Sequence, residues 1–165
     1  MNILILSAST GGGHMRASKA IEGYMTQQNK DINVKIVDSL LYISPILNKT
    51  ITSGYVYLAT KTPKLYGKLY DLTNKEHRLA NFVTRLNNIF ANKLLPLIDD
   101  FRPDVIITTH PFPTEMVSRL KSKGEINIPL ICIMTDYAPH KAWINIVQTA
   151  ERLVDRIVKG GSTAA

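Results

Sequence analysis

Short apolar runs alternate with longer amphipathic stretches along this chain. Four runs have the length and β-branched content of buried strands, at residues 2–7, 33–38, 105–108 and 130–134. Apolar residues spaced three or four positions apart predict helices over residues 14–29, 75–99 and 113–123. Strands that alternate with helices are typical of a doubly wound, mainly parallel sheet with helices on both faces. The pattern therefore predicts an α/β, Rossmann-like fold.

The longest predicted helix, over residues 75–99, has the clearest apolar stripe. The stripe consists of Leu79, Phe82, Val83, Leu86, Ile89, Phe90, Leu94 and Leu97. Pro96 is expected to bend or tighten the last turn, because proline has no N–H to donate. Residues 39–74 lack this periodicity and are expected to be irregular. We expect one domain over residues 1–143, a C-terminal helix over 144–159 and a disordered tail over 160–165.

Composition limits the classes of protein to consider. The length of 165 residues suits one domain, and the formal net charge of +7 indicates attraction to an anionic partner. No apolar stretch approaches the roughly 20 residues that cross a bilayer, and no secretory signal is visible. The single cysteine, Cys132, lies in an apolar run and is interpreted as a small core residue, not as a nucleophile. One thiol cannot form an internal disulfide, which fits a reducing compartment.

Three predicted strands end in loops that carry reactive side chains. These loops cover residues 9–14, 108–111 and 135–140. Ligands of open parallel sheets bind at the carboxyl ends of the strands, where the strand order reverses. If the first and third strands are neighbours, His14 and His110 flank that point.

The first of these loops contains three consecutive glycines, Gly11 to Gly13. Their backbone can approach a ligand closely, and N–H groups at a helix start favour a phosphate or a sugar-linked oxygen. The loop lacks the lysine of a Walker A motif, and Arg16 replaces the last glycine of a dinucleotide fingerprint. Asp38 is either a ribose-binding acid or a helix cap. The alternative interpretation of the loop is a tight turn without a ligand.

His14 is the strongest candidate for proton transfer. It begins a predicted helix, whose dipole favours a neutral imidazole that can accept a proton from a hydroxyl. Asp136 follows a buried strand and can orient a histidine, act as a base or cap a turn. His110 is a weaker candidate, and His77 is interpreted as solvated. The histidines have no metal-ligand spacing, and no Gly-x-Ser-x-Gly elbow is present.

A basic aromatic stretch occupies residues 55–78. Its tyrosines and cations are Tyr55, Tyr57, Tyr66, Tyr70, Lys61, Lys64, Lys68, Lys75 and Arg78. Rings beside ammonium groups suit the headgroup zone of an anionic membrane. A solvated helical hairpin is the main alternative, and single-stranded nucleic acid ranks third because no nucleic-acid motif accompanies the stretch.

Taken together, these segments resemble the N-terminal domain of the diacylglycerol glycosyltransferases. This family includes the monogalactosyldiacylglycerol synthases and the processive diacylglycerol glucosyltransferases. The similarity covers residues 1–143 and is specific in the order and spacing of its pieces. Its pieces are residues 3–14 with Ala17, 63–70, 103–112 and 135–143.

The resemblance implies the N-terminal half of a two-domain GT-B enzyme that transfers hexose from a UDP-sugar to diacylglycerol with inversion. His14 would be the base, assisted by Asp136. The substrate-binding candidates are Gly11, Gly12, Gly13, Thr109, His110, Tyr137 and His140. The membrane-contacting candidates are Tyr55, Lys61, Lys64, Tyr66, Lys68 and Tyr70. The implied partners are diacylglycerol or a related lipid and an anionic membrane surface, with no nucleic acid, no metal and no cofactor besides the UDP-sugar co-substrate.

The sequence departs from the family pattern after Trp143, where the family continues into more of this domain and a nucleotide-binding domain. We therefore expect a truncated chain that lacks the donor site and is inactive alone, peripheral on the cytoplasmic face of the cell membrane. Self-association through the exposed truncated face is expected as well. The alternatives are a non-catalytic lipid- or phosphate-binding module, a nucleotide-binding Rossmann protein, and a transferase acting on lipid-linked peptidoglycan precursors.

Overall fold

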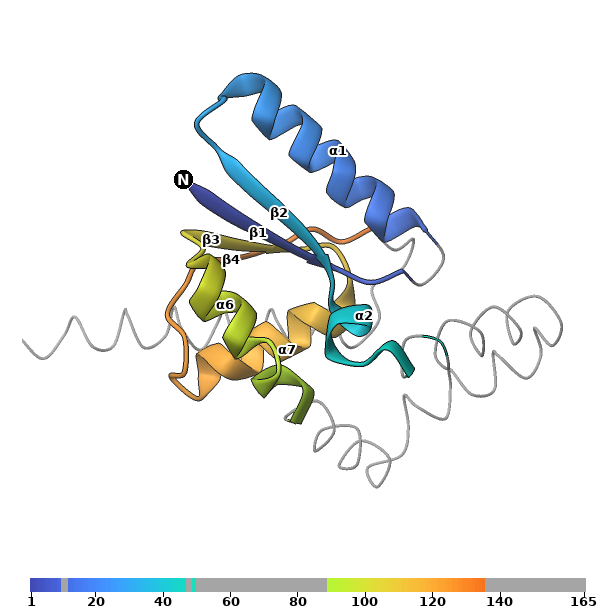
Figure 1. Cartoon of the computed structure of the whole chain (residues 1–165), viewed down its shortest axis with the longest axis vertical. Coiled ribbons are helices and arrows are strands. Elements are labelled where there is room, and N and C mark those ends of the chain that lie inside the picture. The colour runs from blue at the N-terminus through green and yellow to red at the C-terminus, as the bar shows by residue number, and fades with distance from the viewer. Residues whose placement is uncertain (10–11, 47–48, 50–88, 136–165) are drawn as a thin grey trace, which may run out of the picture.

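The computed structural model describes residues 1–9, 12–46, 49 and 89–135 (Figure 1). The predicted C-terminal helix, the tail and the basic aromatic stretch lie outside these residues. In chain order the elements are β1 (Asn2–Ser7), α1 (Gly13–Gln28), β2 (Asn33–Asp38), α2 (Ser39–Ile43), α6 (Leu95–Phe101), β3 (Val105–Thr108), α7 (Pro111–Ser122) and β4 (Leu130–Cys132).

The four strands form one parallel sheet in the order β2-β1-β3-β4. In the register of the sheet, Ile5 of β1 lies beside Ile36 of β2 and Ile107 of β3. The strand order reverses between β1 and β3, because the chain leaves β1 toward β2 and returns to the other side of β1. The predicted α/β, Rossmann-like fold is confirmed, and so is the conditional prediction that the first and third strands are neighbours.

Successive residues of β1 point to opposite faces of the sheet, and both faces are covered. Ile3 and Ile5 belong to the apolar cluster on the side of α1, against which Ile21 and Met25 pack. Leu4 and Leu6 belong to the larger cluster built with residues of α6 and α7. Figure 1 shows α1 on one side of the sheet and α6 and α7 on the other. A strand covered in this way needs apolar residues at every position, which explains the continuous run at 3–6.

The prediction of one continuous helix over residues 75–99 is wrong in its C-terminal part, where the helix is interrupted. Residues 89–92 are helical, residues 93–94 form a turn, and α6 then begins at Leu95. Pro96 lies in the first turn of α6, where a missing N–H costs nothing because that group has no acceptor in the helix. Ile89 of the predicted stripe is 59% exposed, whereas Ala91 is buried. Residues before 89 lie outside the described ranges.

Three further element boundaries differ from the prediction. The short helix α2 lies in the segment predicted to be irregular, and the Asp38 side chain caps it by accepting from the Leu41 N–H at 3.1 Å. The helix α7 begins at Pro111, two residues early, because the His110 side chain caps it. The strand β4 ends at Cys132 instead of Met134.

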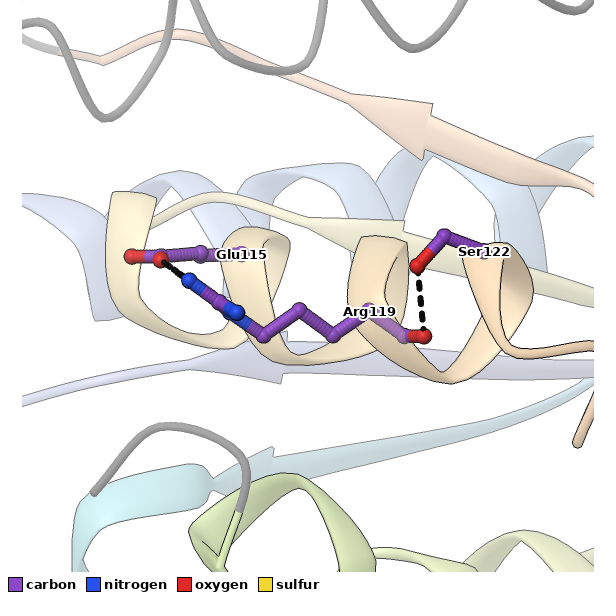
Figure 2. A network of polar contacts seen from close by, with 3 residues as sticks. All are labelled: Glu115, Arg119 and Ser122. Carbon is purple, nitrogen blue, oxygen red and sulfur yellow. Dashed lines mark hydrogen bonds and ion pairs between the residues drawn. The ribbon is translucent and has the colours of Figure 1, made fainter. Parts of the chain in front are cut away.

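An ion pair ties two successive turns of α7 together (Figure 2). Arg119 Nη2 lies 2.6 Å from Glu115 Oε1, and the Ser122 hydroxyl donates to the Arg119 carbonyl at 2.9 Å. A pair at this spacing stabilises a helix by about 0.3–0.5 kcal/mol. The main stabilisation of α7 therefore comes from its buried face, which includes Met116, Val117 and Leu120.

The edge of the sheet where the strands begin, called here the amino edge, is held by hydrogen bonds of Asn2. Its backbone N–H donates to Asp104 Oδ2 at 2.7 Å, and its side chain bonds to the Phe101 carbonyl and to Asn33. A surface pocket opens at the same end, lined by Ile98, Asp99, Arg102, Pro103, Glu125, Ile126 and Ile128. None of the helices in the described ranges has the length and apolar character needed to cross a bilayer.

Cys132 is half-buried on β4, with its sulfur 3.8 Å from the Thr114 hydroxyl. Burial raises the pKa of the thiol, although hydrogen bonds with Thr114 and Thr108 oppose this effect. The folded thiol therefore stays protonated at a pH where an ordinary cysteine ionises, which argues against a nucleophile. The predicted core position is wrong, because Cys132 is only half-buried and no residue of β4 is fully buried.

We expect iodoacetamide to alkylate Cys132 more slowly in the folded chain than in urea, because the thiolate is the reactive form. The difference should persist as the pH rises to the ordinary thiol pKa, since only the unfolded thiol then ionises. Mass spectrometry of timed samples measures both rates. Equal rates in the folded and unfolded chain would contradict this prediction.

Candidate functional site

Three chain segments meet at the carboxyl edge of the sheet, where β1, β3 and β4 end. The Nδ1 atom of His14, in the first turn of α1, lies 2.9 Å from the Thr109 carbonyl oxygen just after β3. The same Nδ1 lies 2.5 Å from the Thr135 hydroxyl, three residues after β4. The ring centroids of His14 and His110 are 4.5 Å apart. The two histidines predicted to flank the reversal of strand order are therefore in contact.

The surroundings of His14 determine which ring nitrogen carries the proton. A backbone carbonyl can only accept a hydrogen bond, so Nδ1, facing the Thr109 carbonyl, must be the protonated nitrogen of the neutral ring. Nε2 then has the lone pair. This is the tautomer that a general base needs if it takes up a proton at Nε2.

His110 has the opposite tautomer. Its Nδ1 accepts a hydrogen bond from the Phe112 backbone N–H at 3.1 Å, so Nδ1 carries the lone pair and Nε2 carries the proton. The two rings meet edge to face, with 81° between their planes. The two neighbouring rings thus differ in tautomer: in their neutral forms His14 has its lone pair on Nε2 and His110 has its proton there.

A set of buried hydroxyl groups holds together the segments that carry His14 and Thr109. The Thr109 hydroxyl donates to Ser7 Oγ at 2.8 Å and lies 2.9 Å from Ser18 Oγ, which in turn donates to the His14 carbonyl at 3.0 Å. All three hydroxyl residues are fully buried. Their hydrogen bonds link the end of β1, the start of α1 and the end of β3. Removing one of these hydroxyl groups should lower the free energy of unfolding, because its buried partner would then lack a hydrogen bond.

Of these hydroxyl residues the sequence singled out Thr109 but not Ser7 or Ser18, and it marked Thr135 only as the first residue of the loop 135–140. The available signal was a serine at the end of an otherwise apolar strand and another on the inner side of α1. A polar residue at a buried position needs a partner, and this could have marked both serines. The loop position of Thr135 did not predict the partners of its hydroxyl, His14 and Thr109, which lie elsewhere in the chain.

The glycine loop contributes two described residues to the site. Gly12 has a φ of +77° and precedes α1, and Gly13 is the first residue of that helix. Gly12 has no side chain to cap α1, so the first backbone N–H groups of the helix receive no bond from a capping side chain. Only Gly12 of this pair has the left-handed backbone that favours glycine.

The two glycines should respond oppositely to alanine. Gly12→Ala forces a Cβ into the left-handed region and should lower the free energy of unfolding by about 1–2 kcal/mol. Gly13→Ala has no positive φ and no atom within 4 Å of the new Cβ, so it should leave stability equal or raise it by up to about 1 kcal/mol. Urea denaturation of both variants checks this, and equal destabilisation would contradict it.

Asp38 is a structural residue of the same edge. Its carboxylate accepts hydrogen bonds from the backbone N–H and the hydroxyl of Ser9, and from the Leu41 N–H that it caps. The cap interpretation is therefore confirmed. These bonds also fix the start of the glycine loop against the end of β2.

Several predicted site residues lie outside the described residues. They are Gly11, Asp136, Tyr137, His140, Tyr55, Lys61, Lys64, Tyr66, Lys68 and Tyr70. Within the ranges that the structure describes, no three histidine, cysteine or carboxylate side chains gather as metal ligands would.

Comparison with known proteins identifies the family of this sequence. The sequence profile described as Monogalactosyldiacylglycerol (MGDG) synthase matches residues 14–153. A Staphylococcus aureus protein (strain MRSA252), named processive diacylglycerol beta-glucosyltransferase, is 32% identical over 155 residues, and one of the same name from strain JH9 is 30% identical over 149.

Each alignment covers 89% of this chain but 36% of the relative, so the chain spans about a third of the length of the curated relatives. No solved structure matches the chain. The matched range begins at His14 and includes the two loops that contact its ring. The chain therefore belongs to the monogalactosyldiacylglycerol synthase family.

Proposed function

We propose that these residues form the acceptor-binding part of an inverting glycosyltransferase. The reaction moves a hexose from a UDP-sugar to the hydroxyl of diacylglycerol at a membrane surface. The contact of His14 Nδ1 with the Thr109 carbonyl oxygen at 2.9 Å, from which the tautomer follows, is the observation that carries this proposal. The names of the relatives support the acceptor and the sugar transfer. Because the chain spans about a third of those relatives, we assign donor binding to the remaining two thirds.

In this proposal His14 is the general base. Nε2 takes the proton of the acceptor hydroxyl while the hydroxyl oxygen bonds to the anomeric carbon, and the bond from that carbon to the UDP oxygen breaks on the opposite face. The configuration inverts and no covalent enzyme intermediate forms. The imidazolium that results keeps its Nδ1–H bond to the Thr109 carbonyl.

Neighbouring groups hold the acceptor in this scheme. The His110 Nε2–H donates to an oxygen of the acceptor, and the N–H groups after Gly12 bind an acceptor or leaving-phosphate oxygen. From the sequence we add Asp136 as an assisting group, and Gly11, Tyr137 and His140 as further substrate contacts. The tyrosines and lysines of residues 55–70 would dock on the anionic cytoplasmic face of the cell membrane.

A chimera tests the proposal directly. Residues 1–143 replace the aligned part of the S. aureus relative, and transfer of labelled hexose from UDP-glucose or UDP-galactose to diacylglycerol vesicles is measured. We expect transfer by the chimera and none by the 165-residue chain alone. A folded chimera without transfer, or turnover by the 165 residues alone, would overturn the proposal. Circular dichroism and UDP binding show whether the chimera is folded.

A non-catalytic lipid- or phosphate-binding module is the second candidate. It is favoured by the formal net charge of +7, which attracts an anionic surface or a phosphate. Both candidates predict sedimentation of the chain with anionic vesicles, but only the transferase predicts activity of the chimera.

A further inference from the structure

The contacts of Thr135 suggest a role that neither the fold nor the family match assigns. Its hydroxyl lies 2.5 Å from His14 Nδ1 and donates to the Thr109 carbonyl oxygen at 3.0 Å. The same carbonyl is 2.9 Å from Nδ1. Three polar atoms from α1, the end of β3 and the segment after β4 therefore form a closed triangle.

Only one assignment of protons satisfies all three contacts. The carbonyl accepts from both neighbours, using its two lone pairs. The Thr135 hydroxyl proton is then directed at the carbonyl, so the oxygen turns a lone pair toward Nδ1. The proton on Nδ1 is shared between two acceptors, the Thr109 carbonyl and the Thr135 hydroxyl. Both favour the same tautomer and the same ring orientation.

We propose that Thr135 is a positioning residue, whose hydroxyl keeps the His14 ring in the orientation and tautomer that leave the lone pair on Nε2. Only the effect of Thr135 on catalysis rests on the proposed function. The effect on the ring itself is a property of the folded chain and is measured without any substrate.

Nitrogen-15 NMR of the histidine rings in the 165-residue chain tests this at a pH where His14 is neutral. In the unmodified chain, Nδ1 should resonate as a protonated nitrogen and Nε2 as an unprotonated one. Thr135→Val keeps the shape but removes one of two acceptors, so the ratio of tautomers should shift about fivefold, the effect of one ordinary hydrogen bond. Thr135→Ser should restore the original ratio, and Thr135→Ala, the second hydroxyl-free variant, should shift it as Thr135→Val does.

Thr114→Val is the matched control. It also removes a threonine hydroxyl near the site, but that hydroxyl bonds to the Thr108 hydroxyl and the His110 carbonyl. It should lower stability without changing the His14 tautomers. An unchanged ratio in Thr135→Val and Thr135→Ala, or an equal shift in Thr114→Val, would overturn the inference.

The chimera separates this result from the proposed function. If Thr135→Val lowers kcat severalfold with KM unchanged and Thr135→Ser restores it, both ideas are supported. If the NMR shift occurs while every folded chimera is inactive, the positioning role stands and the transferase proposal fails. If the chimera is active but the His14 tautomer ratio does not change in the Thr135 variants, the transferase proposal stands and the positioning role fails.

Discussion

Replacing His14 with alanine in the chimera is expected to lower kcat by about 10²–10⁴-fold, the usual contribution of a general base. The loss should fall on kcat, because the imidazole acts on the hydroxyl as the new bond forms. The remaining rate would come from binding and orientation of the two substrates. Initial rates over a range of UDP-sugar concentrations separate kcat from KM.

The structure offers a control on the same helix for this variant. Thr26 is exposed, and its hydroxyl bonds only to backbone carbonyls of its own helix, those of Glu22 and Gly23, among its described contacts. Thr26→Ala should leave kcat within twofold. Added imidazole should partly restore the His14→Ala variant if the ring acts as a base. An active His14→Ala chimera would exclude His14 as the base.

Replacing Leu94 with alanine is expected to lower the free energy of unfolding by about 2–5 kcal/mol. Leu94 is fully buried in the turn before α6, and it packs in the cluster that contains Leu4, Leu6 and Ile106. Alanine would leave a cavity between this turn and the sheet. Because domains of this size are stable by only about 5–15 kcal/mol, the loss should be plain in urea denaturation.

Ile89 provides the contrast for Leu94. Both belong to the apolar stripe seen in the sequence, and a continuous helix with that stripe inward would make their truncation similarly costly. In the structure Ile89 is 59% exposed, so Ile89→Ala should change stability by less than about 0.5 kcal/mol. Equal losses for the two variants would contradict the described break at residues 93–94.

The central strands β1 and β3 were predictable because both of their faces are covered, whereas the outer strands β2 and β4 are only partly buried. Burial on two sides requires unbroken apolar runs, which are visible in a single sequence. The break after residue 92 was not predictable from periodicity, since apolar spacing on both sides of it fits one helix. Pro96 was the informative residue, but proline suits the first turn of a helix as well as a disturbed last turn. The helix α2 has only five residues, too few to show a period.

The candidate site was predictable in part. His14 and His110 were singled out because each follows a strand, and their contact followed once β1 and β3 were known to be neighbours. The hydroxyl groups that orient them were mostly missed. The role of a hydroxyl depends on which carbonyl or ring the fold places beside it. The residues around Thr135 do not predict its contacts with Thr109 and His14.

The hydrogen bonds of Asn2 stabilise the amino edge, while the two imidazoles lie at the opposite end of the strands. Changes that adjust heat tolerance can therefore accumulate around Asn2 and Asp104 without moving the reactive groups. Adaptation to a warmer or colder habitat can thus change the stability of this domain at the amino edge while the residues at the carboxyl edge stay the same.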